Sequence, residues 1–315
     1  MELPLPPLPC LPPFWARGGH LQTLAAQYLP TPHQELPWER FRLVLADGDA
    51  LALQALRGPS GLVVALFHGL GGSVEGHYMR RAAALFHAAG HTVVAVNHRG
   101  AGAGRGLAQG IYHSGATPDM AAVLDLCRER YQGARLVVVG FSISANIALL
   151  LAGRDHHLAQ PDAVLAVNPP ADLDACSRRL VTGFSRAYDQ YFLRRLGREV
   201  AGRPGAENLG RLRTLRDFDA AYTAPRAGFP SRAEYYAGCS CGPHLAGIQV
   251  PTVILTSVDD PFAPGSDVQR FPRSAQVHLH VERTGGHMGY VARNVPGRRW
   301  LDHALAHYVG ALAAR

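Results

Sequence analysis

A short turn between a strand-like run and a helix-like run constrains this chain more than any other stretch. Residues 140–146 read Gly-Phe-Ser-Ile-Ser-Ala-Asn, with a valine-rich run at 135–139 before them and an apolar run at 147–152 after them. A strand that turns this abruptly into a helix needs small residues around the turning position, whose backbone is strained. Because Ser142 occupies that position, we expect its hydroxyl to project from the end of a sheet. The amide of Ile143 would lie beside it at a helix N-terminus.

The turn departs from the common pattern Gly-x-Ser-x-Gly at one position. Ser144 replaces the second glycine and is followed by Ala145. A serine adds a hydroxyl where the helix and the strand nearly touch, so the turn is either slightly opened or tolerant of the extra group. Taken alone, the heptad also fits an ordinary strand-to-helix turn with a capping serine.

Strands and helices alternate on both sides of this turn. Residues 39–57 have the pattern of a β-hairpin. Helix-like segments follow at 80–90, from Thr117 onward and at 300–312. In the second of these helices, Thr117 is the expected N-cap and Pro118 occupies the first helical position. Such alternation predicts an α/β fold with a mostly parallel central sheet flanked by helices. Continuous apolar runs predict its buried strands at 61–67, 91–96, 163–167, 251–256 and 277–281.

The first forty residues differ from the rest. Residues 1–40 are punctuated by prolines and contain one short helical candidate at 20–28. We expect this arm to pack on the main body, with Phe14, Trp15 and Leu21 as its apolar anchors.

The pattern changes again between the predicted strands at 163–167 and 251–256. Residues 173–247 have helical spacing but no strand-like run, which predicts a helical cap inserted over the C-terminal edge of the sheet. The α/β core would then comprise residues 41–172 and 248–315. The cap holds 12 arginines against 7 acidic residues. We interpret this excess as a solvated surface in preference to a site for anionic head groups.

Charge and cysteine content narrow the function classes. The net charge of +7 comes from 31 basic residues, all arginine, against 24 acidic ones. These arginines do not form clusters with interleaved aromatic residues on a recognisable nucleic-acid-binding module. No nucleic-acid partner is therefore predicted. Five cysteines without disulfide spacing are typical of a reducing compartment, and Cys239 and Cys241 lack a matching pair for zinc. No apolar run approaches the roughly 18 residues of a membrane span, and prolines interrupt any signal peptide. A cytoplasmic protein is expected.

Three polar residues follow predicted strands in the order Ser142, Asp260, His287. Because parallel strands end at one edge of a sheet, we expect the three side chains to meet there. A serine hydroxyl is a weak nucleophile until a base takes its proton, an imidazole can do so near neutral pH, and a carboxylate orients the imidazole. Asp259 and Asp260 could each be the acid or a turn former. The Asp-Pro-x-x-Pro spacing favours Asp260.

A nucleophilic serine also needs amide donors for the negative oxygen that develops on its substrate. The glycine-rich loop at 68–73 reads His-Gly-Leu-Gly-Gly-Ser. We predict that the amides of Leu70 and Ile143 supply these donors, and that His68 shapes its loop without reacting.

Long motifs give the chain a specific resemblance. It resembles the YheT-like branch of the α/β-hydrolases, also called hydrolase family 4, whose members are implied to hydrolyse carboxylic esters. Some relatives act on medium-chain acyl esters or phospholipids, and some transfer acyl groups to alcohols. The usual elbow of that family has two glycines where this chain has Ser144 and Ala145. The matching stretches are 12–24, 68–72, 97–100, 112–115, 214–219 and 259–262.

Three readings follow. The first is a serine esterase acting on short- to medium-chain acyl esters through an acyl-enzyme on Ser142, Asp260 and His287. The second transfers the same acyl group to an alcohol. The third, motivated by the altered elbow, is a catalytically silent protein that binds a ligand under the cap. The triad chemistry needs no cofactor and no metal. The expected partner is a small-molecule acyl ester, with transient contact to lipid substrates.

Overall fold

The computed structural model describes residues 1–30, 35–207 and 209–315. Residues 31–34 of the predicted arm and Asn208 of the predicted cap lie outside the described residues.

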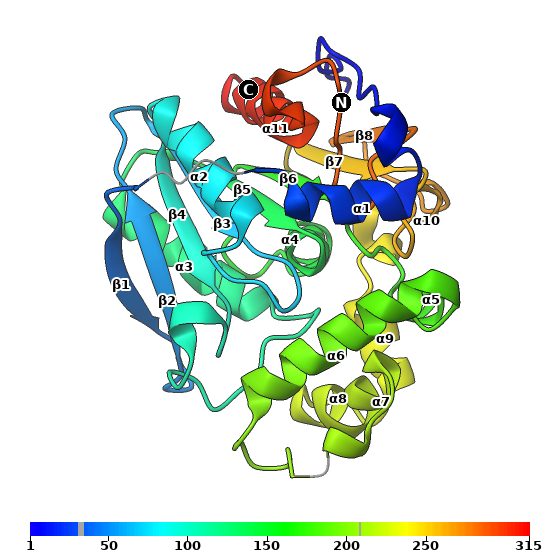
Figure 1. Cartoon of the computed structure of the whole chain (residues 1–315). Coiled ribbons are helices and arrows are strands. Elements are labelled where there is room, and N and C mark those ends of the chain that lie inside the picture. The colour runs from blue at the N-terminus through cyan, green and yellow to red at the C-terminus, as the bar shows by residue number, and fades with distance from the viewer. Residues whose placement is uncertain (31–34, 208) are drawn as a thin grey trace.

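One eight-stranded sheet forms the centre of the molecule (Figure 1). Its strand order is β1-β2-β4-β3-β5-β6-β7-β8. The first two strands form the predicted hairpin and β2 runs antiparallel to β4, whereas the other neighbours are parallel. The predicted α/β class is therefore confirmed. The strands are β1 (Glu39–Val44), β2 (Ala50–Leu56), β3 (Leu62–Phe67), β4 (Thr92–Asn97), β5 (Arg135–Phe141), β6 (Ala163–Val167), β7 (Thr252–Ser257) and β8 (Val277–Glu282).

Helices cover both faces of this sheet. On β3, alternate residues belong to two different hydrophobic clusters, as the period of two in a strand requires. Val63, Ala65 and Phe67 pack with α3 (Thr117–Arg130) and α4 (Ile143–Gly153). The intervening residues pack with α2 (His77–Ala88) and α11 (Trp300–Ala313). Among the described residues, no helix is both long and apolar enough to cross a lipid bilayer.

The start of α3 differs from the prediction. Ala116, not Thr117, occupies the N-cap position, and no side chain caps the helix. The Thr117 hydroxyl instead donates to Asp155 at 2.6 Å, at the C-terminal end of the neighbouring α4. The hydroxyl that the local sequence predicted to cap the helix therefore binds a buried carboxylate instead.

The cap segment, residues 173–247, lies between β6 and β7 and is helical throughout its named elements (Figure 1). A third hydrophobic cluster joins it to the core, where Tyr112 and Phe262 pack among cap residues such as Tyr188 and Leu196. The division into core and cap stays a prediction. The helices of the segment are α5 (Leu173–Leu180), α6 (Arg186–Val200), α7 (Leu215–Phe218), α8 (Ala224–Arg226) and α9 (Arg232–Cys239), and α10 (Gly265–Gln269) follows β7.

The arm contains α1 (Gly19–Tyr28), close to the predicted helix. Its predicted anchors are wrong, because Phe14, Trp15 and Leu21 are 81%, 37% and 50% exposed. Among the described residues of the arm, the buried ones are Leu3, Pro6, Cys10, Pro13, Ala16, Gln22 and Thr23. Apolar character alone therefore does not identify the side of α1 that packs on the core.

Candidate active site

Ser142 lies in the turn between β5 and α4, with φ of 54° and ψ of −115°. Such a conformation costs a non-glycine residue about 1–3 kcal/mol, and surrounding structure must hold it. The amide of Ser142 donates to the carbonyl of Val167 at 2.8 Å. A Cβ at Gly140 would lie 2.5 Å from the carbonyl oxygen of Ser144, so this glycine is what lets the helix pass so close to the strand.

The imidazole of His287 joins Ser142 to Asp260. His287 Nε2 is 2.9 Å from Ser142 Oγ, and His287 Nδ1 is 2.7 Å from Asp260 Oδ2. Asp260 is buried, and burial works to raise its pKa. The neighbouring His287 and the amides of Phe262 and Ala263 outweigh burial and hold the pKa below its usual value. An ionised Asp260 accepts a hydrogen bond from the Nδ1–H of His287, which leaves Nε2 unprotonated and able to take a proton from Ser142.

Asp259 and Asp260 have different partners. Asp259 Oδ1 accepts hydrogen bonds from the amides of Gly285 and Gly286, both at 2.9 Å. Its Oδ2 accepts the hydroxyl of Thr284, also at 2.9 Å. Asp259 therefore fixes the loop that carries His287, whereas Asp260 contacts the ring.

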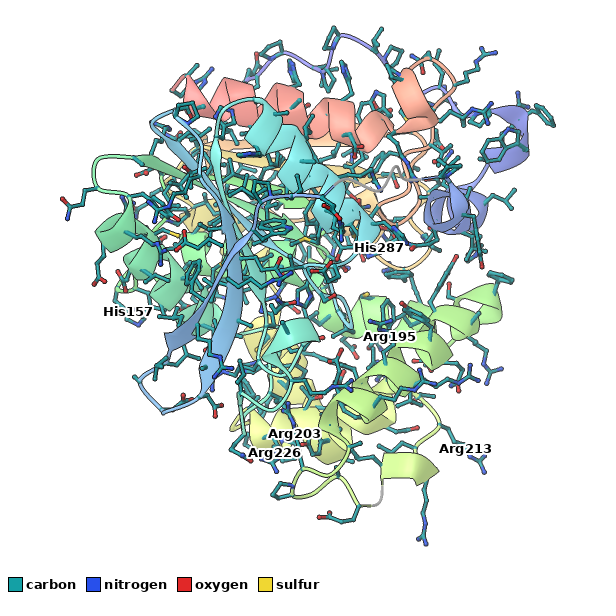
Figure 2. All side chains as sticks on the ribbon, turned by 60° about the vertical axis from the view of Figure 1, so that its left-hand side comes forward. His157, Arg195, Arg203, Arg213, Arg226 and His287 are labelled. Atoms are coloured by element: carbon teal, nitrogen blue, oxygen red, sulfur yellow. The ribbon has the colours of Figure 1, made fainter. Side chains whose placement is uncertain are left out.

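Helix α1 packs almost backbone to backbone against the loops that carry Asp260 and His287. A Cβ at Gly19 would lie 1.6 Å from the carbonyl oxygen of Asp259. Thr23 Oγ1 accepts the amide of His287 at 2.9 Å. Figure 2 shows His287 on the core, opposite the part of the cap segment that carries Arg195. The arm thus supports the candidate base, a role that its sequence did not suggest.

In the part of the chain that the structure describes, the amides of the three glycines in the glycine-rich loop have acceptors, and the amide of Leu70 between them has none. Gly69 and Gly71 donate to the hydroxyls of Tyr78 and Tyr112, both at 2.8 Å, and Gly72 donates to the carbonyl of Gly69. A Cβ at Gly69 would lie 3.3 Å from Ser142 Cβ, so the loop lies directly beside the turn.

Ser144 occupies the position of the missing second glycine without disturbing this geometry. Its side chain is fully buried and contacts His98 Nε2 at 2.7 Å and the carbonyl of His68 at 2.5 Å. The close helix–strand contact falls on Gly140. The turn is therefore tolerant of the extra hydroxyl, the second of the two alternatives that the sequence left open.

Asn168 is a site residue that the sequence reading treated only as the end of a strand. It directly follows β6 and has a positive φ of 48°. Its side-chain amide donates to Asp260 Oδ2 at 2.8 Å, and its Oδ1 accepts the hydroxyl of Tyr290 at 3.0 Å. A polar residue at the carboxyl end of a parallel strand was the available signal.

The chain is similar to known proteins in sequence and in fold. Residues 63–293 match the model of the alpha/beta hydrolase fold family. "Putative esterase YheT" of Escherichia coli (strain K12) is 30% identical and covers 92% of this chain and 89% of its own length. "Medium-chain fatty acid ethyl ester synthase/esterase 2" of Saccharomyces cerevisiae is 26% identical over 81% of this chain and 63% of its own.

A solved esterase of Pyrococcus furiosus is 18% identical and has a TM-score of 0.61, covering 91% of this chain and 97% of its own. That likeness concerns the fold alone, and it agrees with the central sheet flanked by helices described above. The family match covers most of the chain, including the turn and both loops. The chain therefore belongs to the α/β-hydrolase family, in its YheT-like branch.

Proposed function

We propose that this protein hydrolyses carboxylic esters with Ser142 as nucleophile, His287 as general base and acid, and Asp260 as the carboxylate that orients His287. Its relatives and its fold identify the protein as a carboxylic ester hydrolase. The observation that carries the assignment of residues is the continuous hydrogen-bond chain from Ser142 Oγ through His287 to Asp260.

The reaction has two steps. His287 Nε2 takes the proton of Ser142 as Oγ attacks the ester carbonyl, and the same proton passes to the departing alcohol. Water then attacks the acyl-enzyme, again with His287 as base, and releases the acid. In both steps the amides of Leu70 and Ile143 would donate to the oxyanion. The amide of Ile143 has the added advantage of lying at the N-terminus of α4, where the helix dipole favours negative charge.

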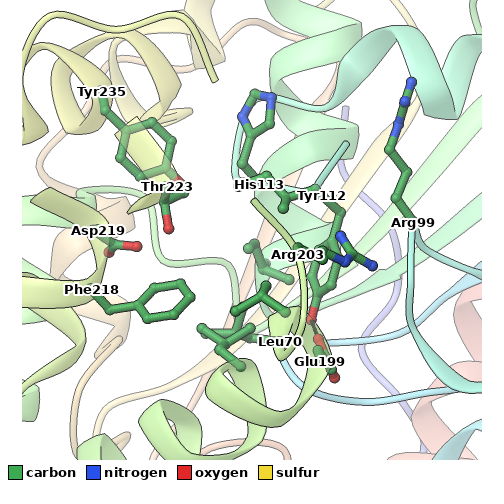
Figure 3. A pocket seen from close by; sticks show the side chains of 14 residues that line it. Leu70, Arg99, Tyr112, His113, Glu199, Arg203, Phe218, Asp219, Thr223 and Tyr235 are labelled. Carbon is green, nitrogen blue, oxygen red and sulfur yellow. Dashed lines mark hydrogen bonds between the residues drawn. The ribbon is translucent and has the colours of Figure 1, made fainter. Parts of the chain in front are cut away.

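The space beside these amides favours short- to medium-chain acyl groups. A cavity of about 30 Å³ lies between the core and the cap segment (Figure 3). This volume is on the order of two water molecules. An acyl chain larger than this volume requires the lining residues of α6 and α7 to move. The apolar residues of the lining are Leu70, Ile111, Ile143, Leu196, Val200 and Phe218.

Acyl transfer to an alcohol is the second candidate. It uses the same acyl-enzyme, and the yeast relative carries both synthase and esterase in its name. With ethanol added to the assay, hydrolysis gives mainly free acid and transfer gives ethyl ester. Product analysis therefore separates the two.

Treatment with a fluorophosphonate tests the assignment, because this reagent labels an activated serine whatever the natural substrate is. We expect one adduct by intact mass in the native protein and none in Ser142→Ala. The variant should lose nearly all ester turnover and keep at most about 10³ to 10⁴-fold over the uncatalysed rate.

Thermal unfolding of both proteins serves as the control for folding. Wild-type turnover in Ser142→Ala would contradict the assignment. A folded native protein that takes no label would favour the silent ligand-binding reading.

A further inference from the structure

Three side-chain hydroxyls hold the glycine-rich loop in place. Tyr78 accepts the amide of Gly69, Tyr112 accepts the amide of Gly71, and Ser144 donates to the carbonyl of His68. The amide of Leu70 lies between the amides of Gly69 and Gly71. Its direction therefore depends on hydrogen bonds made by side chains from α2, from the loop after β4 and from α4.

The hydrogen positions around Ser144 follow from the acceptors present. The carbonyl of His68 can only accept, so the single Ser144 hydroxyl proton is directed to it. Ser144 Oγ must then accept from His98, which places the proton of that ring on Nε2. The amide of His98 donates to His68 Nε2 at 3.2 Å, so His68 carries its proton on Nδ1, which donates to the carbonyl of Gly69.

His98 itself is held firmly. Its ring is buried and stacks on the ring of Tyr112 at 5.0 Å between centroids, with 14° between the planes. The next residue, Arg99, makes two hydrogen bonds to Asp119 and reaches Asp47 and Asp49 as well. Burial lowers the pKa of His98 to about 4, so the neutral ring required by this arrangement persists at neutral pH.

We propose that Ser144 and His98 are positioning residues, which together fix the carbonyl of His68 and thereby aim the amide of Leu70 at the reacting carbonyl oxygen. This inference rests on the proposed function of Ser142. It reverses the simplest view of the altered elbow, because the serine in place of glycine supplies a hydrogen bond that glycine cannot make.

Single and paired substitutions test the proposal. We expect Ser144→Ala, Ser144→Gly and His98→Leu each to lower kcat about tenfold or more, with KM changed less than about twofold. An oxyanion donor acts on the transition state rather than on substrate binding, and its complete loss typically costs about 10² to 10³ in kcat. The double variant Ser144→Ala/His98→Leu should be no worse than the poorer single variant, because both changes remove one shared contact. His98→Gln, which keeps an amide donor at similar reach, should recover most of kcat.

Ser240→Ala is the matched control. Ser240 is also buried and also makes two hydrogen bonds, to the carbonyl of Tyr236 and from the amide of Leu173, but both bonds lie within the cap segment. We expect it to lower the unfolding temperature about as much as Ser144→Ala while leaving kcat within about twofold. If Ser144→Ala does not fold, the two His98 variants report on the same contact.

The outcomes separate this inference from the proposed function. If the native protein labels with fluorophosphonate and turns over ester, yet folded Ser144→Ala or Ser144→Gly keeps or exceeds wild-type kcat, the positioning role is wrong and the nucleophile assignment stands. An equal loss in Ser240→Ala would also overturn the positioning role. If the native protein does not label, both proposals fall together.

Discussion

Asp259 and Asp260 follow the same strand, yet their carboxylates bind different groups. Asp260 contacts the ring of His287, whereas Asp259 accepts three hydrogen bonds from residues 284–286, which directly precede His287. We expect Asp260→Asn to lower kcat about 10³ to 10⁴-fold, because an amide NH₂ facing Nδ1 favours the wrong tautomer of His287. Asp259→Asn is the matched control, since it removes one charge one residue away but keeps an acceptor for the two glycine amides. Its kcat should fall by about tenfold or less.

Steady-state kinetics on one ester, with unfolding temperatures for both variants, make this comparison. Equal losses would contradict the separation of roles. The Asp-Pro-x-x-Pro spacing favoured Asp260 as the acid, but the local pattern did not predict that Asp259 holds the loop that carries His287. The site residues that the sequence analysis missed also act through contacts between distant positions. Asn168 and Asp260 are 92 positions apart, and Thr23 and His287 are 264 positions apart. Contacts of this kind leave no periodic signal.

At the scale of elements, strands and long helices followed the apolar pattern and the arm did not. Continuous apolar runs located β3 to β7, which are buried on both faces. Helix boundaries were less accurate, and α2 begins at His77 where the pattern suggested Arg80. In the arm, α1 is held by polar groups, because its backbone lies too close to the core loops for large side chains to fit between them.

Gln22 shows how α1 is attached. Its side chain is fully buried, donates to the carbonyls of Ala16 and Val291, and accepts the amide of Val291. Truncation would leave these buried backbone groups unpaired, at about 1–3 kcal/mol each where water does not enter. We expect Gln22→Ala to lower the free energy of unfolding by at least about 3 kcal/mol in urea denaturation.

The exposed neighbour Leu21 provides the control for this prediction. Leu21→Ala should change the free energy of unfolding by no more than about 0.5 kcal/mol, as is usual for surface substitutions. The opposite ranking would mean that α1 is anchored by its apolar residues after all. Ester turnover should also fall in Gln22→Ala, because the loop that carries His287 rests on this helix.

At the scale of the whole molecule, the cap segment meets the core through titratable groups that are buried or partly buried. The sequence predicted an inserted segment from the break in strand pattern. The sequence did not predict how that segment packs on the core, because the residues that join them come from distant loops. Glu199 of α6 lies at this junction and accepts the Tyr112 hydroxyl at 3.4 Å. Burial raises its pKa to about 7, against the lowering effect of Arg195, Arg203 and Arg105.

This raised pKa makes stability depend on pH in a defined direction. Between the ordinary value of 4.5 and about 7, folded Glu199 keeps a proton that the unfolded chain has released, so the free energy of unfolding falls as pH rises through this window. The full effect is on the order of 3 kcal/mol. Asp219, whose pKa burial raises to about 6, adds a slope of the same sign.

We therefore expect the native protein to lose more stability than Glu199→Gln between pH 5 and pH 8, measured by urea denaturation. Glu207→Gln, an exposed change in the same segment, should follow the native protein. A Glu199→Gln variant with the native pH dependence would show that Glu199 is already ionised at pH 5 and that the junction is open to water.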